Sequence, residues 1–90
     1  MPRYVVERTF PEGLQIAVAD GGAEACRSVV ARNSEQDVTW VHSYVSQDKK
    51  HTFCIYDSPS PEAIRTTAGL NGLPIDRITQ VQVLDPYFYA

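Results

Sequence analysis

The side chains best suited to chemistry lie in three stretches that are rich in aromatic and β-branched residues. Glu7 lies in the first stretch and Ser43 in the second. The third stretch holds Cys54 and Tyr56, two residues apart. A carboxylate and a thiolate together are borderline-soft ligands for a divalent transition metal, whereas a hydroxyl and a phenol can hydrogen bond a small polar ligand. The candidate metal ligands are therefore Glu7 and Cys54, and the candidate ligand-binding residues are Ser43, Tyr56, Trp40 and Tyr44.

The two histidines, His42 and His51, supply the only imidazole groups. Imidazole is a usual protein ligand for nickel, zinc and copper, so both join the candidate metal ligands. His42 lies within an apolar stretch, where it is either a hydrogen-bonded core histidine or a ligand or acid–base group. In an enzyme, His42 would be the catalytic residue. His51 directly follows a polar turn, and we expect it to be solvated.

No catalytic signature accompanies these groups. The sequence has no GxSxG elbow, phosphate loop, HExxH, CxxC or GxGxxG motif. The two cysteines are far apart, fit no paired metal-ligand spacing, and are too few for a disulfide scaffold. Gly21 and Gly22 precede a helix, but two glycines are more typical of a plain loop-to-helix turn than of an anion site. The residues alone therefore do not disclose a reaction.

The elements that position these groups follow from the hydrophobic periodicity. The expected strands span residues 3–9, 38–46, 51–58 and 75–84, and the expected helices span residues 22–34 and 61–71. Residues 47–50 form a four-residue polar turn, which makes the second and third strands a hairpin. Ser60 can cap the second helix, Pro61 suits its first position, and Pro74 prevents it from continuing.

The order strand, helix, strand, strand, helix, strand predicts a ferredoxin-like α+β domain that spans residues 1–90. In this βαββαβ fold a four-stranded antiparallel sheet carries both helices on one face. The other face also holds Val, Tyr and Trp side chains, and the chain has no further element to cover it. We therefore expect a second copy to pack there, giving a homodimer that meets sheet to sheet.

The turn between the second and third strands sets their cross-strand pairs, provided that Ser46 lies opposite His51. One face then pairs Tyr44 with Phe53, His42 with Ile55, and Trp40 with Asp57. The other face pairs Val45 with Thr52, Ser43 with Cys54, and Val41 with Tyr56. Glu7 joins Ser43, Cys54 and Tyr56 in a polar pocket if the pleat of its strand puts its side chain on the same face of the sheet. The alternative to a pocket is that Glu7 and Arg8 are only adjacent opposite charges, and that the polar residues hydrogen bond to one another where two chains meet.

Charge and hydropathy exclude two classes of partner. The formal net charge of -3 leaves no basic field for nucleic acid, and Lys49 and Lys50 form the only adjacent basic pair. No apolar run approaches the roughly 20 residues that cross a bilayer, and residues 1–4 do not resemble the start of a signal peptide. We expect a cytoplasmic protein that binds neither nucleic acid nor membrane.

Five strings in chain order resemble a family of small bacterial ferredoxin-like domains that includes a nickel-binding protein. They are YVVER at 4–8, WVHSYV at 40–45, FCIY at 53–56, SPSPEAI at 58–64 and DRITQV at 76–81. The resemblance implies a dimeric α/β barrel with a transition-metal site, nickel above all, near the interface. In the nickel-binding branch the first strand ends in Asp-Arg-His and the second helix carries two histidines. Here Glu7-Arg8-Thr9, Thr67 and Asn71 hold those positions.

Two functions from different classes remain open. The first is a binding protein that holds a divalent transition metal or a small molecule between two sheets, with Glu7, Ser43, Cys54 and Tyr56 lining the cavity. The second is a cofactor-free monooxygenase or isomerase, with His42 as the acid–base group. The second hypothesis depends on fold analogy alone.

Overall fold

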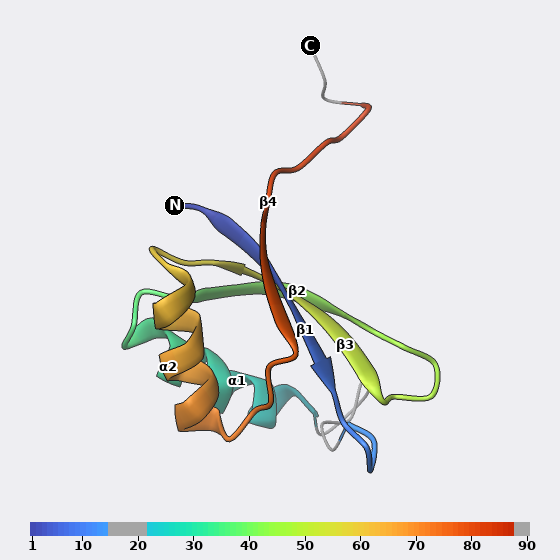
Figure 1. Ribbon diagram of the computed structural model, residues 1–90. Coiled ribbons are helices and arrows are strands. Elements are labelled where there is room, and N and C mark those ends of the chain that lie inside the picture. The colour runs from blue at the N-terminus through green and yellow to red at the C-terminus, as the bar shows by residue number, and fades with distance from the viewer. Residues whose placement is uncertain (15–21, 88–90) are drawn as a thin grey trace.

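The computed structural model describes residues 1–14 and 22–87, except for the side chains of residues 22–25, 28 and 32. Its elements are β1 (Arg3–Thr9), α1 (Gly22–Ser34), β2 (Thr39–Val45), β3 (His51–Asp57), α2 (Pro61–Asn71) and β4 (Arg77–Val81). The predicted order of strands and helices is confirmed. Figure 1 shows both helices on the same side of the sheet. Residues 15–19 of the short apolar stretch, Gly21, Phe88 and Tyr89 lie outside the described residues.

The four strands form one antiparallel sheet in the order β2-β3-β1-β4. β1 therefore lies inside the sheet, between β3 and β4, whereas β2 and β4 are the edges. β4 is shorter than the 75–84 expected from its alternating pattern. The ladder ends at Val81 because its partner there is Arg3, the first residue of β1.

The ends of α2 follow from its capping residues. Ser60 has extended backbone and its hydroxyl accepts a hydrogen bond from the Ala63 N–H at 3.2 Å, which satisfies a donor that the first helical turn leaves free. Pro61 occupies the first turn, as expected. Gly72 closes the helix with φ of 66°, a left-handed conformation that glycine adopts without a Cβ penalty.

The core lies between the sheet and the helices. Along β1 the buried side chains alternate with partly exposed ones, as the two-residue period of a strand requires. Val6 is fully buried and packs in one cluster with Ile64 of α2. The other buried members of the cluster are Tyr4, Val38, Cys54 and Tyr56. We call this side of the sheet the helix face and the other side the open face.

The hairpin register is confirmed over most of its length but wrong at one end. Val45, Tyr44, Ser43 and His42 lie opposite Thr52, Phe53, Cys54 and Ile55, as predicted. The pairs of Trp40 with Asp57 and of Val41 with Tyr56 are not formed, because the register shifts between Trp40 and His42. A bulge of this kind gives one strand an extra residue. Trp40 therefore lies opposite Tyr56, on the helix face.

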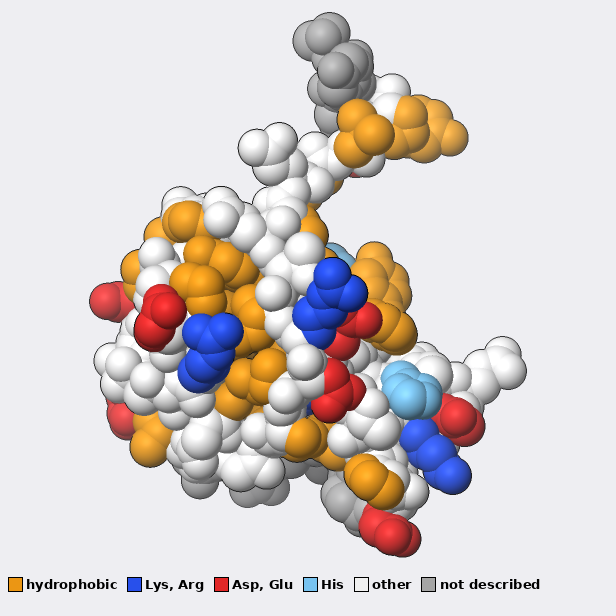
Figure 2. Space-filling model, in the orientation of Figure 1, with side chains coloured by type: hydrophobic (Ala, Val, Ile, Leu, Met, Phe, Trp, Pro, Cys, Tyr) orange, Lys and Arg blue, Asp and Glu red, His pale blue; other side chains and the backbone are white. Residues whose placement is uncertain are grey.

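The chain beyond β4 leaves the body of the molecule. Figure 1 shows this segment extending away from the sheet, and Figure 2 shows hydrophobic side chains near its tip. Tyr87 is 92% exposed, and Val83 and Leu84 are also exposed. No helix among the described residues is long and apolar enough to span a membrane.

Candidate functional site

The predicted site residues divide between the two faces of the sheet. Val6 lies opposite Cys54, whereas Glu7 lies opposite Phe53. Successive side chains of a strand point to opposite faces, so Glu7 is on the open face and Cys54 is beneath the helices. The predicted pocket that combined Glu7 with Ser43, Cys54 and Tyr56 is therefore wrong.

The candidates on the helix face are engaged with other core side chains. Trp40 Nε1 donates to Ser43 Oγ at 2.8 Å, a contact that the bulge makes possible. Cys54 Sγ donates to Thr52 Oγ1 at 3.6 Å, and Cys54 is buried. Cys54 is therefore buried, and Trp40 and Ser43 are half-buried and hydrogen bonded to each other.

Tyr56 is the most strongly perturbed titratable group described. Burial raises the pKa of its phenol to about 12, and the neighbouring Arg8 guanidinium opposes part of that shift. Arg8 Nη1 donates to Tyr56 Oη at 3.4 Å, and the guanidinium carbon lies 5.6 Å from the ring centroid. The phenol is therefore neutral at physiological pH.

One end of the open face brings together an imidazole and a carboxylate through Thr9. Thr9 Oγ1 donates to Asp76 Oδ2, and it also lies 3.4 Å from His51 Nδ1. A hydroxyl has one proton, so the hydroxyl that donates to Asp76 can only accept from His51. In the tautomer that donates from Nδ1 to Thr9, the lone pair of the ring is on Nε2.

Glu7 lies beside this group. It is opposite Phe53, two residues from His51 on the same face of β3, and diagonal neighbours of this kind have Cα atoms about 7–8 Å apart. Asp76 is tied to the same strand, because its N–H donates to the Glu7 carbonyl at 2.8 Å. We call Glu7, Thr9, His51 and Asp76 the hairpin-end cluster.

His42 lies on the open face, away from this cluster. It is exposed rather than a core histidine, and its ring meets that of Tyr44 edge-on with centroids 5.1 Å apart. His42 is opposite Ile55, four residues along β3 from His51. Four residues of strand span about 13 Å, whereas two nitrogens on one metal each lie about 2 Å from it. His42 therefore lies outside the hairpin-end cluster.

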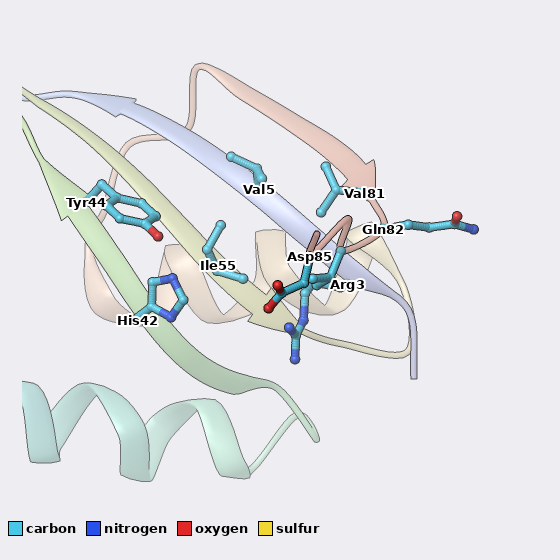
Figure 3. Close-up of a pocket in the computed structure, with 9 residues that line it drawn as sticks. Arg3, Val5, His42, Tyr44, Ile55, Val81, Gln82 and Asp85 are labelled. Atoms are coloured by element: carbon cyan, nitrogen blue, oxygen red, sulfur yellow. The ribbon is translucent and has the colours of Figure 1, made fainter. Parts of the chain in front are cut away.

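A shallow groove of about 510 Å³ runs beside His42 (Figure 3). Val5 and Ile55 contribute apolar surface to it, and His42 and Tyr44 border it from β2. Its remaining lining residues are Arg3, Val81, Gln82, Val83 and Asp85. Arg3 forms an ion pair with Asp57, with Nε 2.8 Å from Oδ1, and the pair keeps the pKa of the Asp57 carboxyl below its usual value.

The donor groups are of the kinds that bind a nickel-class ion, but they are not grouped closely enough in one chain to hold it. Within the described part of one chain, no three His, Cys, Asp or Glu side chains are grouped closely enough to hold a metal. The hairpin-end cluster nevertheless contains one imidazole and two carboxylates. Asp76 is not among the site residues that the sequence predicted, and it comes near Glu7 through the pairing of β4 with β1.

The two α2 positions at which the nickel-binding branch carries histidines do not add ligands here. Thr67 is buried and its hydroxyl donates to the Ile64 carbonyl at 2.9 Å. The Asn71 side chain donates to Asn33 Oδ1 of α1 at 3.3 Å. Both side chains therefore contribute to packing around the helices.

Comparisons with known proteins agree with this architecture. The fold is a small ferredoxin-like α+β arrangement, with candidate ligand groups on the sheet face that the two described helices leave open. Residues 4–81 match the family described as "Nickel responsive protein SCO4226-like", and the chain belongs to this family. The crystal structure of SCO4226 from Streptomyces coelicolor A3(2) is similar, with a TM-score of 0.72 and 17% identity over 92% of this chain and 99% of that chain. At this identity the likeness shows a shared fold. No curated protein matches.

Proposed function

We propose that this protein binds a divalent transition metal of the nickel class at the hairpin-end cluster. The observation that carries the proposal is the contact of Thr9 with both His51 and Asp76. Metal-bound histidines almost always donate their second ring N–H to a neighbouring acceptor, which fixes the tautomer and orients the ring. Thr9 provides that acceptor, so Nε2 of His51 is the expected ligand atom. Membership of a nickel-responsive family supports the choice of metal.

Glu7 and Asp76 add two carboxylates at the same end of the sheet, but His51, Glu7 and Asp76 of one chain are not grouped closely enough to hold an ion by themselves. A bound divalent cation would be stabilised by the negative charge of the carboxylates, and imidazole would favour nickel, zinc or copper over magnesium. In the nickel-binding branch the first strand ends in Asp-Arg-His, and Thr9 is at the position of that histidine. The cluster therefore occupies the corresponding end of the first strand. Cys54 has no part in the site because it lies on the other face.

A second copy of the chain supplies the remaining ligands in this proposal. Tyr44 is 63% exposed and its cross-strand neighbour Phe53 is 40% exposed, both on the open face. Covering such apolar surface favours association. A homodimer whose open faces meet would place the cluster at the margin of the interface, where the second chain can add donors.

The two histidines provide a matched test of this site. We expect nickel to raise the melting temperature of the wild-type protein, because a ligand that binds only the folded state stabilises it. His51→Ala should lose most of this rise, and Glu7→Gln and Asp76→Asn should each reduce it. His42→Ala is the control for removing an exposed imidazole from the same face and should keep the rise. A nickel response that His42→Ala abolishes and His51→Ala retains would refute the assignment.

The groove beside His42 favours a second candidate function, the binding of a small polar organic molecule. The groove combines apolar surface with the His42 imidazole and the Tyr44 phenol, as ligand sites commonly do. If such a molecule is turned over, His42 is the acid–base group. A compound that stabilises the wild-type protein but not His42→Ala would support this function, and equal stabilisation of both would exclude the groove.

A further inference from the structure

Arg8 is a buried cation on the helix face, with only 3% of its surface exposed. A guanidinium keeps its proton in proteins, so the charge cannot be removed by titration. Its contact with the Tyr56 hydroxyl, at 3.4 Å, is longer than the usual 2.7–3.2 Å. Its Nε is buried and has no hydrogen-bond acceptor. The structure therefore leaves a charged donor unsatisfied inside the core.

No described carboxylate balances this charge. The ion pairs in the described part of the chain join Arg3 to Asp57 and Arg65 to Glu62, and Glu7 lies on the opposite face. Tyr56 attracts the cation through its ring, but its hydroxyl is neutral at physiological pH. A buried charge without a compensating partner is strongly destabilising. A negative charge beside Arg8 would remove most of that destabilisation.

Thr52 offers a second donor at the same place. It lies directly opposite Arg8 on β3 and is buried on the same face. Its oxygen accepts from the Cys54 thiol, so its own proton remains available to donate. A guanidinium N–H and a hydroxyl proton, both in a site of low dielectric constant, are the groups that coordinate an anion.

We propose that Arg8 and Thr52 bind one small monovalent anion between the sheet and the helices. Charge sets the valence, because one anion neutralises one guanidinium. Arg8 and Thr52 are each only 3% exposed, so the proposed ligand must be small. Chloride and formate represent the halide and carboxylate forms of this ligand. The site is independent of the hairpin-end cluster, which lies on the other face of the sheet.

Thermal unfolding at constant ionic strength tests the proposal. The reference salt is sodium gluconate, whose anion is too large for the site, and chloride or formate replaces it stepwise. We expect a saturable rise in the melting temperature of about 5 °C or more. Arg8→Met should show no rise. Arg77→Met, which removes an exposed cation from β4, should respond like the wild type. The same melting temperature in all three salts for the wild-type protein would overturn the proposal.

Thr52→Val is a second test that can be made even if Arg8→Met does not fold. This variant keeps the buried charge and removes only the hydroxyl donor, so it should need a several-fold higher anion concentration for half of the rise. Chloride NMR line width gives a readout that does not depend on stability. The wild-type protein should broaden the chloride signal, and formate should reverse the broadening. Anion responses that are the same in wild type, Arg8→Met and Thr52→Val would contradict the site.

Discussion

The phenol of Tyr56 occupies the core between the sheet and the helices, where water does not reach it. Burial there disfavours the phenolate and raises the pKa of Tyr56 to about 12, while the adjacent Arg8 reduces the shift. In the unfolded chain the same phenol has a pKa near 10. Proton binding to this residue therefore contributes to the pH dependence of folding.

Tyr56→Phe should flatten the alkaline limb of the stability profile. The folded pKa is the higher one, so the contribution of Tyr56 is fully present below pH 10 and is lost as pH rises towards 12. A difference of about two pKa units corresponds to a loss on the order of 3 kcal/mol in the free energy of unfolding. Urea unfolding at a series of alkaline pH values measures this loss. Tyr44→Phe, which alters an exposed phenol, should keep the wild-type slope, and an unchanged slope in Tyr56→Phe would contradict the account.

At the scale of the elements, local signals were enough for the helices and most strand boundaries. Capping residues and alternation act within a few positions, so α1, α2 and β1 could be predicted from the sequence. The bulge at Val41 could not, because it depends on how the edge strand β2 bends against β3. The face of Glu7 depended on the long-range register of β1 with β3, which no local pattern reports. The hairpin-end cluster was missed for the same reason, since Asp76 reaches Thr9 only through the pairing of β4.

Ser60→Ala tests the capping of α2. Loss of the hydroxyl leaves the Ala63 N–H without its side-chain acceptor, and the free energy of unfolding should fall by about 1 kcal/mol. Chemical denaturation measures the change. Ser60→Asp restores an acceptor at the helix N-terminus and should recover most of the loss. A Ser60→Ala protein as stable as the wild type would show that the cap contributes little.

For the whole molecule, the uncovered sheet face is the feature that connects fold to function. The helices cover only one face (Figure 1), and the groove with Tyr44 lies on the other (Figure 3). The strand register places Phe53 and the hairpin-end cluster on this second face as well. The sequence predicted this division, because its periodicity indicates two helices, each of which follows a strand of the same sheet. It could not predict which polar groups meet there.

Phe53→Lys should weaken the proposed homodimer. A charge in the centre of an apolar interface is costly to desolvate, so sedimentation at micromolar concentration should detect monomer. Leu70→Lys is the matched control, because Leu70 is 53% exposed on α2, away from the open face. A wild-type protein that sediments as a monomer would refute sheet-to-sheet assembly.

The most direct test of the metal proposal is an NMR titration of the two histidine rings with nickel. Each ring gives its own imidazole signals, and a paramagnetic nickel ion broadens the signals of the ring that binds it. We predict that the His51 signals broaden at substoichiometric nickel while those of His42 persist, and that Nε2 of His51 is the atom affected. Broadening of His42 first, or of neither ring at stoichiometric nickel, would contradict a metal site at the hairpin-end cluster.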